Sequence, residues 1–409
     1  MSGMRALDDI LVLDLSRVLA GPWSTQILAD LGATVIKVEK PGEGDDTRSW
    51  GPPFLKDPQT GERADSSYYL SANRGKQSIT VDMSTEEGQG LLRDLALKAD
   101  VLVENYKVGG LKKYGLDYAS LSPLNPKLVY CSITGFGQTG PYAPRAGYDF
   151  LIQGMGGLMS VTGERDDLPG GGPQKAGVAL ADVMTGLYST IAIVSALNQR
   201  HRSGKGQYLD MALLDVQVGT LANQALYYLV SGQAPIRMGN GHAAIVPYQG
   251  FPCADGYVIL AIGNDGQFSR FADEIGRTDW LQDERFATGI ARVANRAVVV
   301  AAIEAETRKY SMNDLIARLE KRAVPCGPIN TVDRVFADPQ VQARGMQQEV
   351  PHSLMGSVPT LASPLKMSDS PVSYDRGPPL LGEHTEEVLG KYLGLDAARI
   401  ADLRSRKVI

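Results

Sequence analysis

Two aliphatic runs flanking one amphipathic segment constrain the fold of this chain more than any other feature. Residues 10–15 (ILVLDL) form a run of strand length, and residues 35–39 (VIKVE) form a second. Between them, Pro22 suits the first turn of a helix and Gly32 suits its end. A strand–helix–strand unit of this spacing requires parallel strands and a right-handed crossover. The sequence therefore predicts a Rossmann-like start.

The alternation of strand and helix continues through the first third of the chain. Strand-length runs recur at 78–83, 101–105 and 127–133, and a helical pattern occupies 85–96. This order is typical of a doubly wound α/β domain. The first turn lacks the GxGxxG pattern, which argues against a nicotinamide or flavin dinucleotide as ligand.

One carboxylate interrupts an otherwise apolar segment. Residues 176–188 form an apolar run with Asp182 as the single carboxylate and small residues on both sides, and the segment continues with a helical pattern of large aliphatic residues. That pattern predicts a buried helix face made of Leu187, Ile191, Val194 and Leu197. An acid at the head of a helix is either an N-cap or a reactive carboxylate beside apolar surface. The local pattern alone favours the cap, because such caps are common.

Composition excludes several classes of protein. A net charge of −5 without a basic stripe argues against nucleic-acid binding. The 3 cysteines show no CxxC pattern and the 4 histidines are scattered, so we expect a reducing compartment and no metal site. The sequence has no run of about 18 apolar residues and no signal-peptide pattern, so we expect no membrane span and a cytoplasmic protein.

Several stretches, in order along nearly the whole chain, resemble the family III CoA-transferases. This family includes formyl-CoA transferase, carnitine CoA-transferase and the alpha-methylacyl-CoA racemases. Each stretch alone is a weak signal, but together they are specific. The matching stretches are residues 13–22, 31–48, 103–106, 147–149, the Asp182 segment, 204–207, 325–328 and 381–385.

The resemblance implies an α/β fold with a Rossmann-like large domain built from both termini, and a smaller α+β domain. It also implies an interlocked homodimer, with the active site between the large domain of one chain and the small domain of the other. The expected boundaries are 1–200 and 330–409 for the large CoA-binding domain, 201–229 for a linker helix region, 230–322 for the small domain and 323–329 for a return linker.

The resemblance further implies the reaction. Asp182 would attack an acyl-CoA thioester and give an acyl-aspartyl anhydride, which then becomes an aspartyl-CoA thioester. The acceptor acid would take the CoA through a second anhydride. Because an anhydride conserves the reactivity of the thioester, such an exchange needs no ATP. With the family in view, the catalytic interpretation of Asp182 outweighs the capping one, although both roles can coexist.

Members of the same family that act as racemases move only a proton. In that branch a histidine stands at the position of Tyr148 and works with the aspartate that matches Asp182. Tyrosine, with a pKa near 10, is a poor proton-transfer partner at neutral pH. Tyr148 therefore favours the transferase, and an acyl-CoA racemase or epimerase remains the alternative. His242, next to Gly241, could substitute for the missing histidine or be an ordinary loop residue.

Two departures from formyl-CoA transferase concern the substrate. Leu19 replaces a glutamine, and roughly residues 239–249 replace a run of four glycines. The loop 239–248 resembles the branch that uses succinyl-CoA and dicarboxylates such as glutarate, itaconate or citramalate. A second carboxylate would need an arginine or several N–H donors. The candidates are Arg17, Arg48, Arg145 and Arg237, and Arg17 is favoured because it follows the first strand.

The expected ligands are an acyl-CoA and a small carboxylic acid, with no permanently bound cofactor. The family match assigns CoA binding to Lys40, Asn73, Lys76, Asn105, Tyr106 and Lys113. The expected substrate contacts are Arg17, Leu19, Arg145, Tyr148, Gly241 and His242.

Overall fold

The structure, a computed structural model, describes residues 5–409. It contains two compact units, each built from separate stretches of the chain. Unit 1 comprises the chain up to Leu158 together with Ala176–Ala225 and Gln342–Ile409, and unit 2 comprises Met159–Lys175 and Leu226–Val341.

Unit 1 is organised around a six-stranded parallel sheet of order β5-β2-β1-β6-β7-β8. The strands are β1 (Leu11–Asp14), β2 (Thr34–Glu39), β5 (Lys76–Thr80), β6 (Val101–Glu104), β7 (Val129–Thr134) and β8 (Tyr208–Ala212). From β1, the strands β2 and β5 are added on one side of the sheet, and the later strands β6, β7 and β8 are added on the other side, as in Rossmann-type sheets. This arrangement confirms the predicted α/β fold with a parallel central sheet.

Successive residues of the strands point to opposite faces of the sheet, and each face has its own core. Val12 and Val35 belong to the core on one face, whereas Leu13 and Ile36 belong to the core on the other. The first face is covered by α1 (Ala20–Asp30), α5 (Asp149–Met155), α7 (Leu180–Ser203) and α8 (Leu213–Thr220). The second is covered by α3 (Glu86–Lys98), α4 (Tyr118–Leu121), α16 (Thr385–Leu393) and α17 (Ala397–Ser405).

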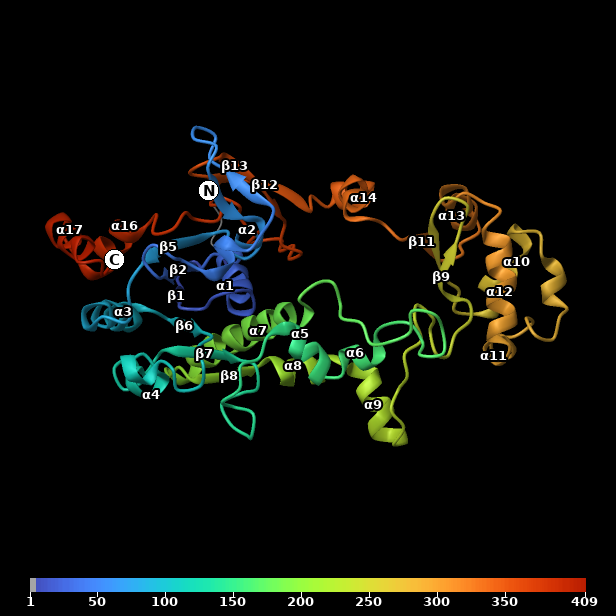
Figure 1. The fold of residues 1–409 in the computed structure, drawn as a ribbon, viewed down its shortest axis with the longest axis horizontal. Helices are drawn as coiled ribbons and strands as arrows, with labels where there is room; N and C mark the ends of the chain where they lie inside the picture. Colours follow the sequence, from blue (N-terminus) through green and yellow to red (C-terminus); the bar gives the residue numbers. More distant parts are fainter. Residues whose placement is uncertain (1–4) are drawn as a thin grey trace. The chain divides into compact units, whose positions relative to one another are not determined.

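The C-terminal segment packs beside the N-terminal strands. The His384 N–H donates to the Ser78 carbonyl at 2.9 Å, and the Asp82 N–H donates to the Val408 carbonyl at 2.7 Å. In Figure 1 the red helices α16 and α17 lie next to the blue strands. Smaller elements of unit 1 are η1 (Asp46–Ser49), β3 (Phe54–Lys56), β4 (Arg63–Ser66), α2 (Ser67–Ala72), η2 (Lys112–Tyr114), β12 (Gln347–His352) and β13 (Gly356–Leu361).

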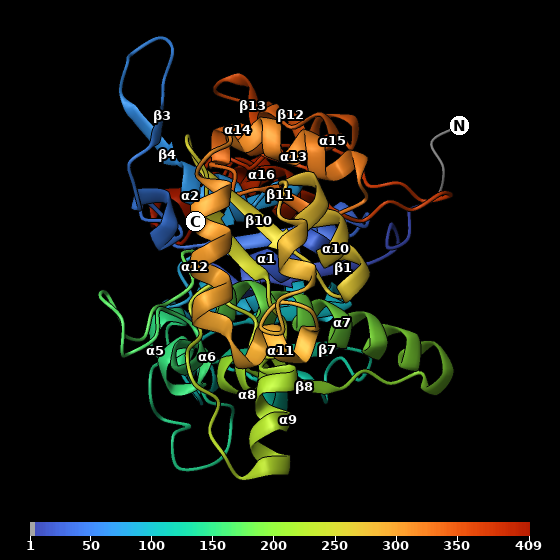
Figure 2. The same ribbon diagram turned by 90° about the vertical axis from the view of Figure 1, so that its right-hand side faces the viewer.

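Unit 2 is a smaller mixed domain, drawn mostly yellow to orange in Figure 2. Its antiparallel sheet has the order β11-β10-β9, and its core includes Phe251, Phe268, Phe271 and Trp280. Its elements are β9 (Tyr248–Pro252), β10 (Tyr257–Ala261), α10 (Asp265–Glu274), η3 (Thr278–Leu281), α11 (Gly289–Ala294), α12 (Arg296–Thr307), α13 (Met312–Lys321), β11 (Cys326–Pro328) and α14 (Val332–Ala337). At the unit boundaries lie α6 (Leu158–Val161), α9 (Ala222–Ser231) and α15 (Pro339–Ala343).

The observed units differ from the expected boundaries at several places. Residues 226–229 and 323–329, expected as linkers, and residues 330–341, expected in the large domain, belong to unit 2. Residues 201–225, expected as a linker, belong to unit 1, because β8 pairs with β7 at the edge of the central sheet. Residues 159–175, expected in the large domain, belong to unit 2. The Gly239 N–H donates to the Gly163 carbonyl at 3.1 Å, and this contact joins the segment to the rest of that unit.

The helix α7 presents a different face to the core than its aliphatic pattern predicted. Leu197 is buried, but Leu187, Ile191 and Val194 are 39%, 60% and 37% exposed. The face that meets α1 consists of smaller residues such as Gly186 and Thr190, which allow the two helices to approach closely.

By length and composition, the 24 residues of α7 would also suffice to cross a membrane, contrary to the expectation from the sequence. A core helix meets the same criteria, and in unit 1 Ile193 and Leu197 of α7 are buried among sheet residues.

Candidate active site

A large cleft opens at the carboxyl ends of the parallel strands, where sheets of this type bind their ligands. It has a volume of about 1020 Å³ and is lined by residues that follow each of the six strands. The segments after β1 and β6, at the point where strand order reverses, contribute Arg17 to Ala20 and Asn105 to Lys107. All of its lining residues belong to unit 1.

The cleft brings together most of the residues that the sequence singled out, although they come from widely separated parts of the chain. The expected site residues that line it are Arg17, Leu19, Lys40, Asn105, Tyr106, Lys113, Arg145, Tyr148 and Asp182.

Asp182 is not the cap of its helix. The helix α7 begins at Leu180, its N-cap is Ala179, and Asp182 lies in the first turn. The cap is supplied from α5: Asp149 Oδ1 accepts the Ala181 N–H at 2.8 Å and the Asp182 N–H at 3.2 Å. The capping interpretation of Asp182 is therefore wrong, because a carboxylate 33 residues earlier occupies that position.

The surroundings of Asp182 disfavour its charged form. Burial, followed by the nearby Asp149 carboxylate, raises the pKa of Asp182 to about 7. Within residues 5–409, no hydrogen-bond donor contacts its side-chain oxygens. Burial also raises the pKa of Tyr68 to about 12, with Asp182 and Asp149 as further causes. Asp182 is thus a weakly solvated carboxylate that does not neutralise a cation, which suits a nucleophile.

If Asp182 is the nucleophile that the resemblance to family III CoA-transferases implies, kcat/KM for CoA transfer should rise about tenfold per pH unit below pH 7 and level off above it. The physical reason is that attack requires the ionised form of Asp182, whose pKa in the free protein is about 7. Steady-state rates between pH 5 and 9, with two different acceptor acids, measure this rising part of the pH profile.

The matched variant is Asp149→Asn, which keeps a cap acceptor but removes the neighbouring charge. We expect it to move the rise in kcat/KM to lower pH. If the pH of the rise changed with the acceptor acid, or stayed the same in Asp149→Asn, the result would contradict this assignment.

The start of α1 lies against the first turns of α7. A Cβ placed on Gly186 would lie 2.8 Å from the Ala20 carbonyl oxygen, so the two backbones approach as closely as glycine permits. Asp182 precedes Gly186 by one helical turn and lines the same cleft as Val18 and Leu19. The turn between β1 and α1 is therefore a wall of the space in front of Asp182.

The four candidate arginines occupy different environments. Arg48 is buried and bonds Glu39 and Asp65, and Arg237 in unit 2 forms an ion pair with Asp166. Both are committed to structural contacts.

Two of the arginines remain in the cleft. Arg17 donates to Asp46 at 2.9 Å, with its guanidinium 5.6 Å from the Tyr106 ring. Arg145 lies over the Phe136 and Tyr142 rings, and among the described residues no carboxylate forms an ion pair with it. The structure therefore favours Arg145 over Arg17 as the cation free to meet a substrate carboxylate.

Asn73 and Lys76 do not line the cleft. Both are fully buried, and the Lys76 ammonium donates to Asp14 at 3.1 Å, to the Pro22 carbonyl at 3.0 Å and to Asn73 at 2.9 Å. The expectation that they contact CoA does not agree with this placement. A lysine with three internal acceptors has no donor left for a phosphate.

The other expected CoA contacts are accessible to a nucleotide in the cleft. Lys40 and Lys113 are exposed, and the Lys113 ammonium lies 4.5 Å from the Tyr114 ring centre. Asn105 and Tyr106 are partly buried in the same cleft. This group offers cationic side chains for phosphates and aromatic surface for a base.

Gly241 and His242 belong to unit 2 and make ordinary loop contacts there. The His242 N–H donates to the Tyr248 carbonyl at 3.0 Å, and its Nδ1 accepts the Ala244 N–H at 3.1 Å. Their relation to the cleft of unit 1 stays a prediction.

Two residues near Asp182 carry no signal in the sequence that marks them as part of the site. Asp149 was noted only as part of the 147–149 triplet, and Tyr68 carried no pattern that marked it. Only their proximity to Asp182 in the fold distinguishes them. Between residues 5 and 409, no group of three His, Cys, Asp or Glu side chains is arranged to hold a metal ion.

Known proteins share both the sequence and the fold. The family model for CoA-transferase family III matches residues 7–385. A succinate–glutarate CoA-transferase of Agrobacterium fabrum is 54% identical over 385 residues, which covers 94% of this chain and 95% of that protein. A human succinyl-CoA:glutarate CoA-transferase is 40% identical over 409 residues, which covers 100% of this chain and 91% of that protein.

The crystal structure of a CaiB/BaiF family protein from Brucella suis is 55% identical, with a TM-score of 0.87. The likeness covers 95% of this chain and 100% of that one. The family model matches nearly the whole length of the chain, and the relatives reach identities well above the level that shows a common family. The chain belongs to CoA-transferase family III, and it is a CoA-transferase.

Proposed function

We propose that the protein transfers CoA from succinyl-CoA to a dicarboxylic acid such as glutarate, with Asp182 as the nucleophile. The observation that carries this proposal is the presence of Asp182 and Arg145 in one cleft. Among the residues that the structure describes, the Asp182 carboxylate has no hydrogen-bond donor and the Arg145 guanidinium has no carboxylate partner. The names of the two relatives, both glutarate CoA-transferases, support the same substrate class.

In the first half of the proposed reaction, a carboxylate oxygen of Asp182 attacks the thioester carbonyl carbon of succinyl-CoA. The C–S bond breaks, and CoA leaves as the thiolate. The thiolate then attacks the Asp182 carbonyl of the mixed anhydride, which releases succinate and leaves an aspartyl-CoA thioester.

In the second half, a carboxylate of the acceptor attacks this thioester and releases the CoA thiolate again. The thiolate attacks the acceptor carbonyl of the new anhydride, giving the acceptor-CoA and restoring the Asp182 carboxylate. The shielded position of Asp182 supports this sequence, because water would hydrolyse either anhydride.

Proton transfer at the alpha carbon finds less support in the cleft. Tyr148 is 69% exposed, and its phenol stands where the racemase branch has a histidine. Asp149, whose charge acts on Asp182, is engaged as the cap of α7.

The proposal is tested by incubating the protein with succinyl-CoA and a panel of dicarboxylates, and by following new CoA esters by mass spectrometry. We expect exchange with at least one dicarboxylate and no exchange in Asp182→Ala. If no acid accepts CoA, while deuterium enters the alpha carbon of an acyl-CoA in D₂O, the protein is a racemase or epimerase instead.

We expect Arg145→Ala to lower the preference for dicarboxylates. A charge-assisted hydrogen bond to a carboxylate contributes about 1.5–3 kcal/mol, so kcat/KM for glutarate should fall roughly 10- to 100-fold. The measurement is a competition between glutarate and pentanoate, which has the same chain length and one carboxylate. Arg17→Ala is the control, because Arg17 already pairs with Asp46. Equal losses for both acids would show that Arg145 does not recognise the second carboxylate.

The exposed aliphatic residues of α7, among them Leu187 and Ile191, support the proposed homodimer. Sedimentation of the purified protein measures its mass in solution, and a mass of one chain would contradict it.

A further inference from the structure

Val18 holds a backbone conformation that valine rarely adopts. Its φ angle is 71°, in the left-handed region, where a β-branched side chain meets the backbone. Among the described residues, Val18 is the one non-glycine residue with positive φ that lines the cleft. Strain of this kind persists only when surrounding contacts enforce it, and it concentrates at functional sites.

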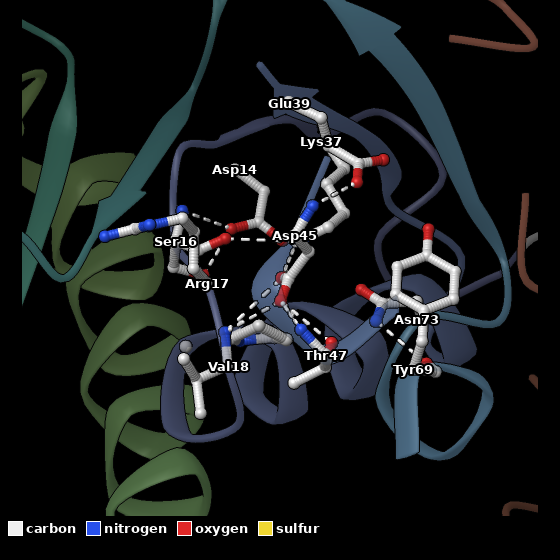
Figure 3. Close-up of polar contacts among 12 residues, drawn as sticks. Asp14, Ser16, Arg17, Val18, Lys37, Glu39, Asp45, Thr47, Tyr69 and Asn73 are labelled. Carbon is white, nitrogen blue, oxygen red and sulfur yellow. Dashed lines mark hydrogen bonds and ion pairs between the residues drawn. The ribbon is translucent and has the colours of Figure 1, made fainter. Parts of the chain in front are cut away.

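Side chains from two other segments hold both peptide groups of the turn between β1 and α1. The Val18 N–H donates to both carboxylate oxygens of Asp45, each at 3.3 Å. The Arg17 N–H donates to Asn105 Oδ1 at 2.9 Å, and Asn105 Nδ2 donates back to the Arg17 carbonyl at 2.7 Å. Figure 3 shows Asp45 directed at the backbone of Val18. No side chain of the turn itself is needed for these contacts.

A buried lysine fixes the position of Asp45. The Lys37 ammonium donates to Asp45 Oδ2 at 2.8 Å and to the Ser16 carbonyl at 3.1 Å, and neither side chain of the Lys37–Asp45 pair is exposed. Thr47 donates to Asp45 Oδ1 through its N–H at 3.0 Å and its hydroxyl at 2.8 Å. Lys37 thus touches the turn at Ser16 and, through Asp45, at Val18.

This network keeps Asp45 ionised. Burial alone would raise the pKa of Asp45, but Lys37 and Thr47 lower it to about 2. A buried ion pair contributes little net stability compared with apolar residues of the same volume, so its presence at this turn calls for another reason. Fixing one specific backbone conformation is such a reason.

We propose that Lys37 and Asp45 are positioning residues for CoA transfer, which hold the Arg17–Leu19 turn in its strained conformation as the wall of the cleft beside Asp182. The pair contacts no reacting atom. It acts through the backbone of Val18 and sets where Arg17 and Leu19 stand in the cleft. This inference rests on the proposed function for its activity measurements, but not for its stability measurement.

The test uses glycine, which adopts positive φ without cost. We expect Asp45→Asn to lower kcat/KM for CoA transfer by about 10- to 100-fold, because the turn relaxes and displaces the wall. Adding Val18→Gly to Asp45→Asn should restore the rate by about fivefold or more. The matched control, Val18→Ala in the same background, removes the branched side chain but keeps the penalty for positive φ, and should restore little.

A second measurement decides the proposal even if Asp45→Asn does not fold. In the otherwise unchanged protein, Val18→Gly should unfold about 2 °C higher than Val18→Ala, although glycine usually destabilises relative to alanine. A higher midpoint for Val18→Ala would overturn the proposal, as would full activity in folded Asp45→Asn or equal rescue by both substitutions. Absence of any CoA transfer in the unmodified protein would refute the proposed function. The comparison of the unfolding midpoints of Val18→Gly and Val18→Ala would then decide whether the turn is strained.

Discussion

Asp182→Asn is expected to abolish CoA transfer, with kcat falling by about 10⁴-fold or more while the protein stays folded. The amide has the shape of the carboxylate but cannot attack a thioester or carry an anhydride. Rates of exchange between succinyl-CoA and glutarate measure the loss. In the unmodified protein, hydroxylamine should convert residue 182 to a hydroxamate during turnover, and this product should be absent from Asp182→Asn.

The same variant is expected to be more stable than the unmodified protein at pH 8. A carboxyl group whose pKa is raised from 3.8 to about 7 on folding binds more protons in the folded state. Its contribution to stability is therefore lost as pH rises from about 4 to 7, and the amide avoids this loss. Allowing for the partial exposure of Asp182, we expect a gain on the order of 1–2 kcal/mol.

The comparison of thermal midpoints at pH 5 and pH 8 tests this expectation, since the gain should shrink at the lower pH. Retained transfer in Asp182→Asn would refute its role as nucleophile. Loss of transfer together with loss of the folded state would instead point to a structural role.

Arg48→Met is expected to produce a large loss of stability in unit 1. The Arg48 guanidinium donates to Glu39 at 2.6 and 2.7 Å, to Asp65 at 2.8 Å and to the Tyr69 hydroxyl at 2.6 Å. It also bonds the Pro379 carbonyl at 3.2 Å and so joins the N-terminal strands to the C-terminal segment. Its removal leaves two carboxylates without their cation, a penalty of about 3–5 kcal/mol for a buried pair.

Thermal unfolding measures this effect, and Arg404→Met serves as the control. Arg404 pairs with Glu386 on the surface, with side chains 55% and 64% exposed, so its loss should cost less than about 1 kcal/mol. The penalty in Arg48→Met should decrease toward pH 5, because an unpaired buried carboxylate takes up a proton. Equal midpoints for the two variants would show that the Arg48 cluster contributes no more than a surface pair.

The segment 31–48 shows what a motif can and cannot reveal. Its resemblance to the family was correct, but the sequence pattern indicated roles only for Lys40 and Arg48. In the structure Lys37, Glu39, Asp45 and Arg48 are all buried in ion pairs. A charged residue in a strand or loop gives the same local signal whether it faces solvent or a buried partner, because the partner comes from elsewhere in the chain.

The helix α7 provides the clearest case of a prediction overturned by packing. Aliphatic residues at helical spacing marked Leu187, Ile191 and Val194 as the inner face, yet glycine, serine and threonine occupy it. Hydrophobicity predicts that a face avoids water, but not which neighbour covers it. The close approach of α1 and α7 requires small residues at their contact. The aliphatic stripe of α7 therefore lies on its solvent-exposed face.

The sequence by itself determined the parallel α/β architecture, the family and Asp182 as the candidate nucleophile, because strand and helix periodicity and motif order are local properties. Only the tertiary structure decided that Asp149 caps α7 and that Asn73 and Lys76 lie in the interior. It alone showed that Arg145 has no carboxylate partner within residues 5–409, and that Val18 is held in a left-handed turn. Each of these depends on contacts between segments far apart in the chain, where burial and the nearest charge set what a side chain can do.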